Sequence, residues 1–152
     1  MIYIITALKI EAQAFVDKYK LSKNKSNDKI SIVVSGLGKD KMYETASKLL
    51  LDMNDEDIFV NVGICGASTK YTIGDIIDND DLICVDKAID DAKKYIAVDM
   101  ESEGFLNACN NRVNTYMFKI VSDHFEPHKV TKDKTKKLIY DKIDEIMKRL
   151  EK

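Results

Sequence analysis

The sequence is poor in proline and has no long apolar run, and each shortage excludes a class of protein. Pro127 is the only proline among 152 residues, and there is no proline-rich linker, low-complexity segment or internal repeat. We therefore expect a single domain over residues 1–152, since a chain of this length lacks material for a second. No apolar stretch approaches the ~20 residues that span a bilayer, so no membrane partner is expected.

Cysteine is also scarce. Cys65, Cys84 and Cys109 are odd in number and widely spaced, which fits reduced, partly buried thiols better than a disulfide framework or a zinc site. The first residues carry no basic lead and no small-residue cleavage site. These features predict a cytoplasmic protein that holds no metal and no cofactor.

Net charge of either sign is small, because 26 acidic residues stand against 24 basic ones. A chain so balanced has no general attraction for the phosphates of nucleic acid or for an anionic membrane. We therefore expect a small-molecule partner and no nucleic acid.

Short apolar runs alternate with segments of helical periodicity along the chain. Strands are predicted at residues 2–6, 30–35, 58–62, 95–98 and 116–121, and more weakly at 73–77 and 82–85. Helical stripes or short helices are predicted at residues 8–19, 42–53, 86–94 and 101–109, with an amphipathic helix from residue 132 onward. This alternation predicts a three-layer α/β/α fold with a mostly parallel or mixed central sheet.

Ligands of such sheets gather beyond the carboxyl ends of the strands, and this sequence places polar groups there. They are Glu11 after the first strand, residues 36–39 after the second, residues 63–66 after the third, Ser122 and Asp123 after the last, and Glu101 at a helix start. These positions can converge although they lie far apart in the sequence. The result would be up to three carboxylates around one crevice, which is a plausible acid/base constellation.

Each feature also has a simpler interpretation. The segment Gly36-Leu37-Gly38-Lys39 matches neither the phosphate-binding loop of nucleotide hydrolases nor the dinucleotide-binding fingerprint. Glu101, near a helix start, could be a partner of the helix dipole. Glu11 could equally be a surface residue of its helix.

A set of short segments follows in order along the chain: Ile5-Thr6-Ala7-Leu8-Lys9-Ile10-Glu11, Ser35-Gly36-Leu37-Gly38-Lys39, Asn61-Val62-Gly63-Ile64-Cys65-Gly66-Ala67 with Ile73-Gly74-Asp75-Ile76, Ala97-Val98-Asp99-Met100-Glu101, and Ile120-Val121-Ser122-Asp123. Together they resemble the purine nucleoside phosphorylase and nucleosidase superfamily. The nearest branch is the methylthioadenosine/S-adenosylhomocysteine nucleosidases. The resemblance covers most of the chain and implies a phosphorylase-like fold.

The resemblance implies hydrolysis of the N-glycosidic bond of a purine nucleoside such as methylthioadenosine or S-adenosylhomocysteine. Asp123 is similar to the acid that protonates or hydrogen-bonds N7 of the purine, and Glu11 to the glutamate that activates the attacking water. Glu101 with Met100 resembles the pair that grips the ribose, the carboxylate accepting bonds from the 2' and 3' hydroxyls. The remaining substrate-binding positions are Gly66, Ser122 and Ile64.

Some features depart from the family pattern. Ile64 stands where the nucleosidases usually have a serine, and Lys119 stands where they often have an arginine. The chain is also short between Asp75 and Tyr95, a region where family members carry extra strands and an aromatic that stacks on the base. The aromatics that could replace it, although they more often belong to a core, are Tyr71, Phe105 and Phe125.

Two alternatives to hydrolysis stay open. Phosphate could replace water as the nucleophile, as in the nucleoside phosphorylases, although Lys39 and Lys119 are single charges that make no convincing phosphate site. A shortened relative could instead bind a nucleoside, or assemble with other proteins, without turnover. The resemblance also implies a homodimer or a higher homo-oligomer, in which a neighbour could cover the pocket.

Overall fold

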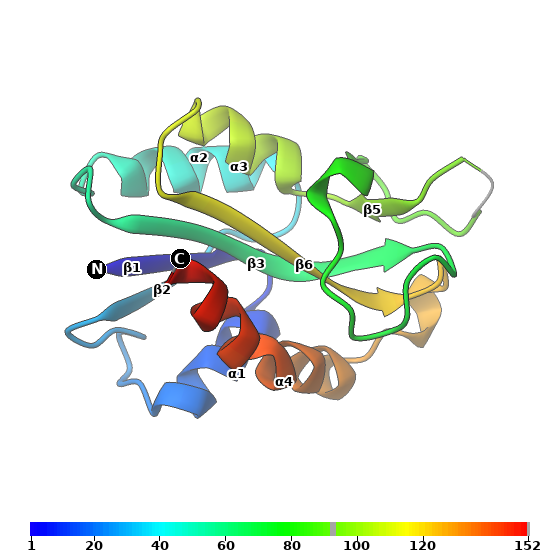
Figure 1. The fold of residues 1–152 in the computed structure, drawn as a ribbon, viewed down its shortest axis with the longest axis horizontal. Helices are drawn as coiled ribbons and strands as arrows, with labels where there is room; N and C mark the ends of the chain where they lie inside the picture. The colour runs from blue at the N-terminus through cyan, green and yellow to red at the C-terminus, as the bar shows by residue number, and fades with distance from the viewer. Residues whose placement is uncertain (92–93, 152) are drawn as a thin grey trace.

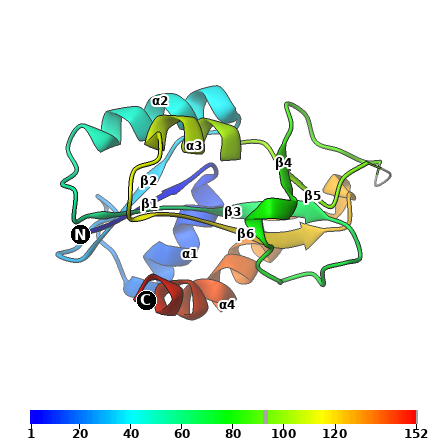
Figure 2. The same ribbon diagram turned by 45° about the horizontal axis from the view of Figure 1, so that its top comes forward.

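The computed structural model describes residues 1–91 and 94–151, which form a mixed six-stranded sheet between two layers of helices (Figures 1 and 2). The elements are β1 (Ile2–Thr6), α1 (Lys9–Tyr19), β2 (Ile30–Val34), α2 (Lys39–Leu50), β3 (Ile58–Ala67), β4 (Leu82–Cys84), β5 (Ala97–Asp99), α3 (Ser102–Cys109), β6 (Thr115–Asp123) and α4 (Lys132–Leu150). Helices α1 and α4 cover one face of the sheet, and α2 and α3 cover the other. The predicted three-layer α/β/α architecture is confirmed.

The strand order is β2-β1-β3-β5-β4, and β6 pairs with the other side of β3. The pairs β1–β2, β1–β3, β3–β6 and β4–β5 are parallel, whereas β3–β5 is antiparallel. The register of β1 on β3 ends at Asn61, and β5 joins the same side of β3 at Gly66. The carboxyl ends of β1 and β5 therefore approach each other from opposite directions.

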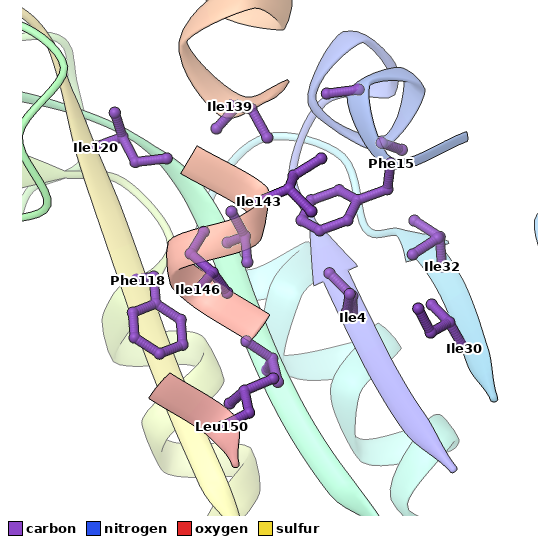
Figure 3. Packing of buried hydrophobic residues seen from close by; sticks show 14 residues of the cluster. Ile4, Phe15, Ile30, Ile32, Phe118, Ile120, Ile139, Ile143, Ile146 and Leu150 are labelled. Carbon is purple, nitrogen blue, oxygen red and sulfur yellow. The ribbon is translucent and has the colours of Figure 1, made fainter. Parts of the chain in front are cut away.

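Two apolar clusters hold the layers together. The cluster in Figure 3 packs α1 and α4 against the sheet, with Phe15 of α1 and Ile143 of α4 both fully buried. On the opposite face, Phe105 of α3 packs edge-on against Phe59 of β3, with ring centroids 5.0 Å apart. Strand alternation divides neighbours between the clusters, as with Ile4 and Ile5. No helix in the described ranges is long and apolar enough to cross a membrane.

Three local predictions differ from the structure. Strand β3 does not end at residue 62 but continues through the glycines to Ala67, because β6 pairs with it as far as Gly66. Residues 73–77 are not a regular strand, although they bond to the outer edge of β6 through backbone hydrogen bonds around an isolated bridge between Ile76 and Ile120. The helix predicted at residues 86–94 is absent from residues 86–91 and 94, while residues 92 and 93 lie outside the described part.

Candidate active site

A cavity of about 390 Å³ opens beyond the carboxyl ends of β1, β5 and β6. This volume lies within the ~300–1,000 Å³ range of small-molecule sites. The structure brings together at its wall every site residue that the sequence predicted: Glu11, Ile64, Gly66, Met100, Glu101, Ser122 and Asp123. The described residues contain no group of three or more His, Cys, Asp or Glu side chains that could hold a metal ion.

A register shift between β3 and β6 helps to place two of these residues. Cys65 pairs with Val121, but the next residue, Gly66, pairs with Asp123, so Ser122 is an extra residue at the strand end. Successive residues of a regular strand point to opposite faces, and a bulge of this kind re-aims them. Ser122 and Asp123 both line the cavity as a result.

Glu11 lies in the first turn of α1, and its carboxylate turns back over the end of β1. Its Oε1 accepts hydrogen bonds from the backbone N–H of Ala7 at 3.1 Å and of Leu8 at 2.8 Å, and its Oε2 accepts one from the N–H of Ile64 at 3.0 Å. The residue is only 2% exposed, which excludes the surface interpretation. The backbone of Ile64 supplies a polar contact that its side chain cannot.

Glu101 precedes α3, but its side chain makes no hydrogen bond at the start of that helix. That contact belongs to Asp99, whose Oδ2 accepts from the N–H of Ser102 at 2.8 Å and from that of Glu101 at 3.2 Å. The Glu101 carboxylate instead accepts a bond from the N–H of Gly38 at 2.7 Å. Gly38 has a φ of 97°, a conformation that favours glycine. This hydrogen bond attaches the loop of residues 36–39 to the cavity wall.

A buried cation lies among the carboxylates. Lys119 of β6 is 1% exposed, and its Nζ lies 3.0 Å from Oδ2 of Asp99. Burial lowers the pKa of Lys119, but the attraction of Asp99, Glu101 and Glu11 outweighs burial and the pKa is raised. A Cβ atom at Gly63 would lie 3.1 Å from Oε2 of Glu11 and 3.2 Å from Nζ of Lys119, so this glycine leaves room for the network.

Burial shifts two of the carboxyl groups toward their neutral forms. It raises the pKa of Glu11 to about 7, although Lys119 and the backbone hydrogen bonds favour the ionised form. It also raises the pKa of Glu101, again against the attraction of Lys119. Glu11 can therefore exchange a proton near neutral pH, which is a property of a general base.

Asp123 accepts hydrogen bonds at both carboxylate oxygens. Its Oδ1 lies 2.7 Å from Oγ of Ser122, and its Oδ2 accepts from the backbone N–H of Glu126 at 2.7 Å. The carboxyl group is 3.7 Å from the position of a Cβ atom at Gly66, so it lies beside the end of β3. These bonds fix the orientation of a carboxylate that borders the cavity.

The rest of the lining is apolar, and no aromatic side chain belongs to it among the described residues. The short segment between Asp75 and Tyr95 contributes an apolar wall of Val85, Ala88 and Ile89. None of the candidate stacking residues reaches the cavity. Phe105 is in the core against Phe59, Phe125 is 3% exposed beside Gly66, and the Tyr71 hydroxyl donates to Asp81 at 2.5 Å.

Sequence reasoning did not identify Asp99 and Lys119 as partners within the site. A signal for Lys119 exists, because it is the one charged residue in the otherwise apolar run from Met117 to Val121. A lysine in a buried strand requires a partner of opposite charge. Asp99 lies two residues before Glu101 in the segment from Ala97 to Glu101. The family resemblance implied no role for it.

No family model matches the sequence, and no curated protein matches it. Solved structures do match: a Campylobacter jejuni 5'-methylthioadenosine/S-adenosylhomocysteine nucleosidase has a TM-score of 0.75 at 14% identity, with 97% of this chain and 96% of that chain covered. The S. pneumoniae nucleosidase with the transition-state inhibitor MT-ImmA has a TM-score of 0.73 at 14% identity, covering 98% and 97%.

A Helicobacter pylori nucleosidase mutant with 5'-methylthioadenosine in its active site has a TM-score of 0.67 at 12% identity, covering 95% of this chain and 98% of that one. The chain has the fold of these nucleosidases. At identities of 12–14%, these matches establish the fold alone. It agrees with the resemblance carried by the strand-end segments, and the cavity lies beyond the ends of the same strands.

Proposed function

We propose that the protein hydrolyses the N-glycosidic bond of a purine nucleoside such as methylthioadenosine or S-adenosylhomocysteine. The observation that carries this proposal is that Glu11, Glu101 and Asp123 line one cavity of nucleoside size in a nucleosidase fold. One of the similar structures holds methylthioadenosine and another holds a transition-state inhibitor. The chemistry of the three carboxyl groups supports the same reaction.

Asp123 is the proposed acid. A purine leaves poorly as an anion, so a proton or a hydrogen bond delivered to N7 lowers the barrier to cleavage. Both oxygens of Asp123 are held by Ser122 and by the backbone of Glu126. A carboxyl group held in this way can meet the purine without reorganising, which is the condition under which a polar group contributes most to catalysis.

Glu101 is the proposed ribose ligand. Its Oε2 is bound to the N–H of Gly38, while the group borders the cavity beside Met100. A carboxylate there can accept bonds from the 2' and 3' hydroxyls. It would also favour the positive charge that accumulates on the sugar in an oxocarbenium-like transition state.

Glu11 is the proposed base for the attacking water. A pKa of about 7 is well matched to a group that must hold and release a proton near neutral pH. The nearby Lys119 and Asp99 are not themselves bases in this scheme. They hold a fixed charge pattern behind the carboxylate.

Water is preferred over phosphate as the nucleophile. Among the described residues, none of those that line the cavity is a lysine, arginine or histidine. Lys119 is already paired with Asp99. A phosphate ion would therefore enter a wall of carboxylates without a compensating cation, which costs free energy.

The assay follows directly. The protein is incubated with methylthioadenosine, adenosine and inosine, with and without phosphate, and the free base and the sugar product are separated by chromatography. We expect the free base in both conditions and an unphosphorylated sugar. Base release that requires phosphate would identify a phosphorylase, and no release at high protein concentration would overturn the enzyme assignment.

A second candidate function is nucleoside binding without turnover. The observation in its favour is the aromatic-free lining of the cavity in the described part of the chain, because a base that is not stacked is held less firmly in the orientation that catalysis requires. A neighbouring subunit could supply the missing aromatic, so we keep the prediction of a homo-oligomer. Calorimetry with methylthioadenosine, together with light scattering, separates the candidates: binding without base release favours the second.

A further inference from the structure

Asp99 is the last residue of β5, and its buried carboxylate is bonded at both oxygens. Its Oδ2 accepts hydrogen bonds from the backbone N–H groups of Ser102 at 2.8 Å and of Glu101 at 3.2 Å, and it lies 3.0 Å from Nζ of Lys119. Its Oδ1 accepts from the hydroxyl of Ser102 at 2.5 Å. One carboxylate therefore holds both the proposed ribose ligand and a cation near the proposed base, Glu11.

Lys119 lies between two carboxylates. A Cβ atom at Gly63 would be 3.2 Å from Nζ of Lys119 and 3.1 Å from Oε2 of Glu11, so the cation and the base border the same small space. The ion pair of Lys119 is nevertheless with Asp99, and no ion pair in the described part of the chain joins it to Glu11. Oε2 of Glu11 accepts from the N–H of Ile64 instead. Only a small movement of Nζ would bring Lys119 into contact with Glu11.

The proton affinity of Glu11 depends on which partner Lys119 has. The charged groups that act on Glu11 are Lys119 of β6 and Glu101 at the start of α3, whereas β3 and the turn after β1 face it with backbone N–H groups. Burial raises the pKa of Glu11 to about 7, and Lys119 opposes this rise. An adjacent cation typically lowers the pKa of a carboxyl group by ~1–3. Direct contact with Lys119 would therefore make Glu11 a weaker base.

We propose that Asp99 is a positioning residue of the reaction, which keeps Lys119 out of direct contact with Glu11 so that the base retains its affinity for a proton. This inference rests on the proposed function. Asp99 acts through Lys119 rather than on the substrate. The cation stays charged in this position, because the attraction of Asp99, Glu101 and Glu11 outweighs the effect of burial on the pKa of Lys119.

The direct test is the pKa of Glu11, followed by NMR of its carboxyl carbon in the intact protein and assigned with Glu11→Gln. Asp99→Asn removes the charge but keeps an oxygen for the N–H groups at the start of α3, since asparagine and aspartate accept such bonds about equally well. Lys119 should then turn to Glu11, and the pKa of Glu11 should fall by about 1 or more. The acid limb of kcat/KM for base release should move to lower pH by the same amount.

Two further variants show whether Lys119 carries the effect. Ser102→Ala removes a hydrogen bond from a neutral group to Asp99 and should leave the pKa of Glu11 at its wild-type value. Asp99→Asn/Lys119→Met removes both charges, a change that proteins often tolerate at a buried ion pair. It should raise the pKa of Glu11 above the wild-type value, because the attraction of Lys119 is gone. If Asp99→Asn alone does not fold, the direction of this shift is the test.

The outcomes separate this inference from the proposed function. If the wild type releases base but the pKa of Glu11 is unchanged or higher in Asp99→Asn, or falls as much in Ser102→Ala, the role of Asp99 is overturned and the proposed function stands. A double variant in which the pKa of Glu11 does not rise also overturns that role. If the wild type releases no base from any nucleoside, the proposed function fails and the role of Asp99 fails with it. A fall in Asp99→Asn that the double variant reverses supports the inference.

Discussion

Nζ of Lys119 lies 3.0 Å from Oδ2 of Asp99, and the side chains of both residues are 1% exposed. The pair joins β6 to β5 at the cavity wall, which Asp99 lines, and Asp99 in turn holds the first backbone N–H groups of α3. Glu11 and Glu101 lie close enough to influence the same cation. One buried lysine thus balances a cluster of carboxylates and connects the fold to the candidate site.

Replacing Lys119 with methionine should strongly destabilise the protein. Removing one partner of a buried ion pair typically costs about 3–5 kcal/mol, because the other charge is left buried without compensation. The loss should be smaller at pH 5 than at pH 8, since the carboxylates can then take up protons. Urea unfolding at both pH values measures this, with Lys137→Met of the exposed pair with Asp141 as the control. An equal loss at both pH values would contradict the account.

The raised pKa of Glu11 predicts a pH dependence of stability. The folded state holds this proton up to a pKa of about 7, whereas the unfolded chain releases it near 4.5. Stability therefore falls as pH rises from about 4.5 to 7 and is level above that, by roughly 3 kcal/mol in total. The difference in unfolding free energy between wild type and Glu11→Gln, measured from pH 4 to 8, isolates this contribution.

In that series the unfolding free energy of Glu11→Gln should rise relative to that of the wild type as pH increases. The amide nitrogen of this glutamine would face the N–H of Ile64. The resulting loss of stability does not change with pH, so it shifts the difference in unfolding free energy by a constant amount. For the control Glu44→Gln, an exposed change in α2, the difference in unfolding free energy from the wild type should not change with pH. Activity should rise with pH through about 7 in the wild type, since the base must be ionised. A pH-independent stability difference would mean that Glu11 titrates normally.

Gly104 is where α3 meets the start of α2. A Cβ atom at this position would lie 2.0 Å from the carbonyl oxygen of Lys39, which belongs to backbone and cannot turn away. Gly104→Ala should therefore cost at least about 1–3 kcal/mol of stability, the usual range for an overpacked contact. Asn107→Ala, at an exposed position of the same helix, is the control for helix propensity. Equal urea midpoints for the two variants would argue against the close contact.

Glu101→Gln should impair ribonucleosides more than 2'-deoxy analogues. A hydrogen bond between a charged group and a hydroxyl is worth ~1.5–3 kcal/mol, so kcat/KM for adenosine should fall roughly ten- to a hundredfold further than for 2'-deoxyadenosine. The exposed Glu145→Gln in α4 serves as the control. Equal losses for both substrates would place the contact elsewhere.

The order of strands and helices could be predicted because it depends on local periodicity. The apolar stripe of α4, with Ile139, Ile143 and Ile146, is visible in the sequence and is buried as expected. The extension of β3 to Ala67 was missed, because glycines at 63 and 66 disfavour a strand unless a long neighbour pairs with them. That neighbour is β6, more than fifty residues later in the sequence.

The positions of the site carboxylates could be predicted from strand ends, but their electrostatics could not. Lys119 was interpreted as a replacement for an arginine and as a single charge that makes no phosphate site, and its contact with Asp99 depends on the antiparallel placement of β5. Ile64 was interpreted by its apolar side chain, whereas its contribution is a backbone N–H given to Glu11. Such contacts arise from tertiary geometry that no local pattern encodes.

The most direct test is adenine release from methylthioadenosine by the wild-type protein, by Asp123→Asn and by Asp144→Asn. Asp144 is an exposed carboxylate of α4 that pairs with Lys18, so its replacement controls for charge alone. We predict release by the wild type and by Asp144→Asn, and a loss of about 10² to 10⁴ in rate for Asp123→Asn. Release by Asp123→Asn at the wild-type rate would contradict the assignment of the acid and, with it, the proposed mechanism.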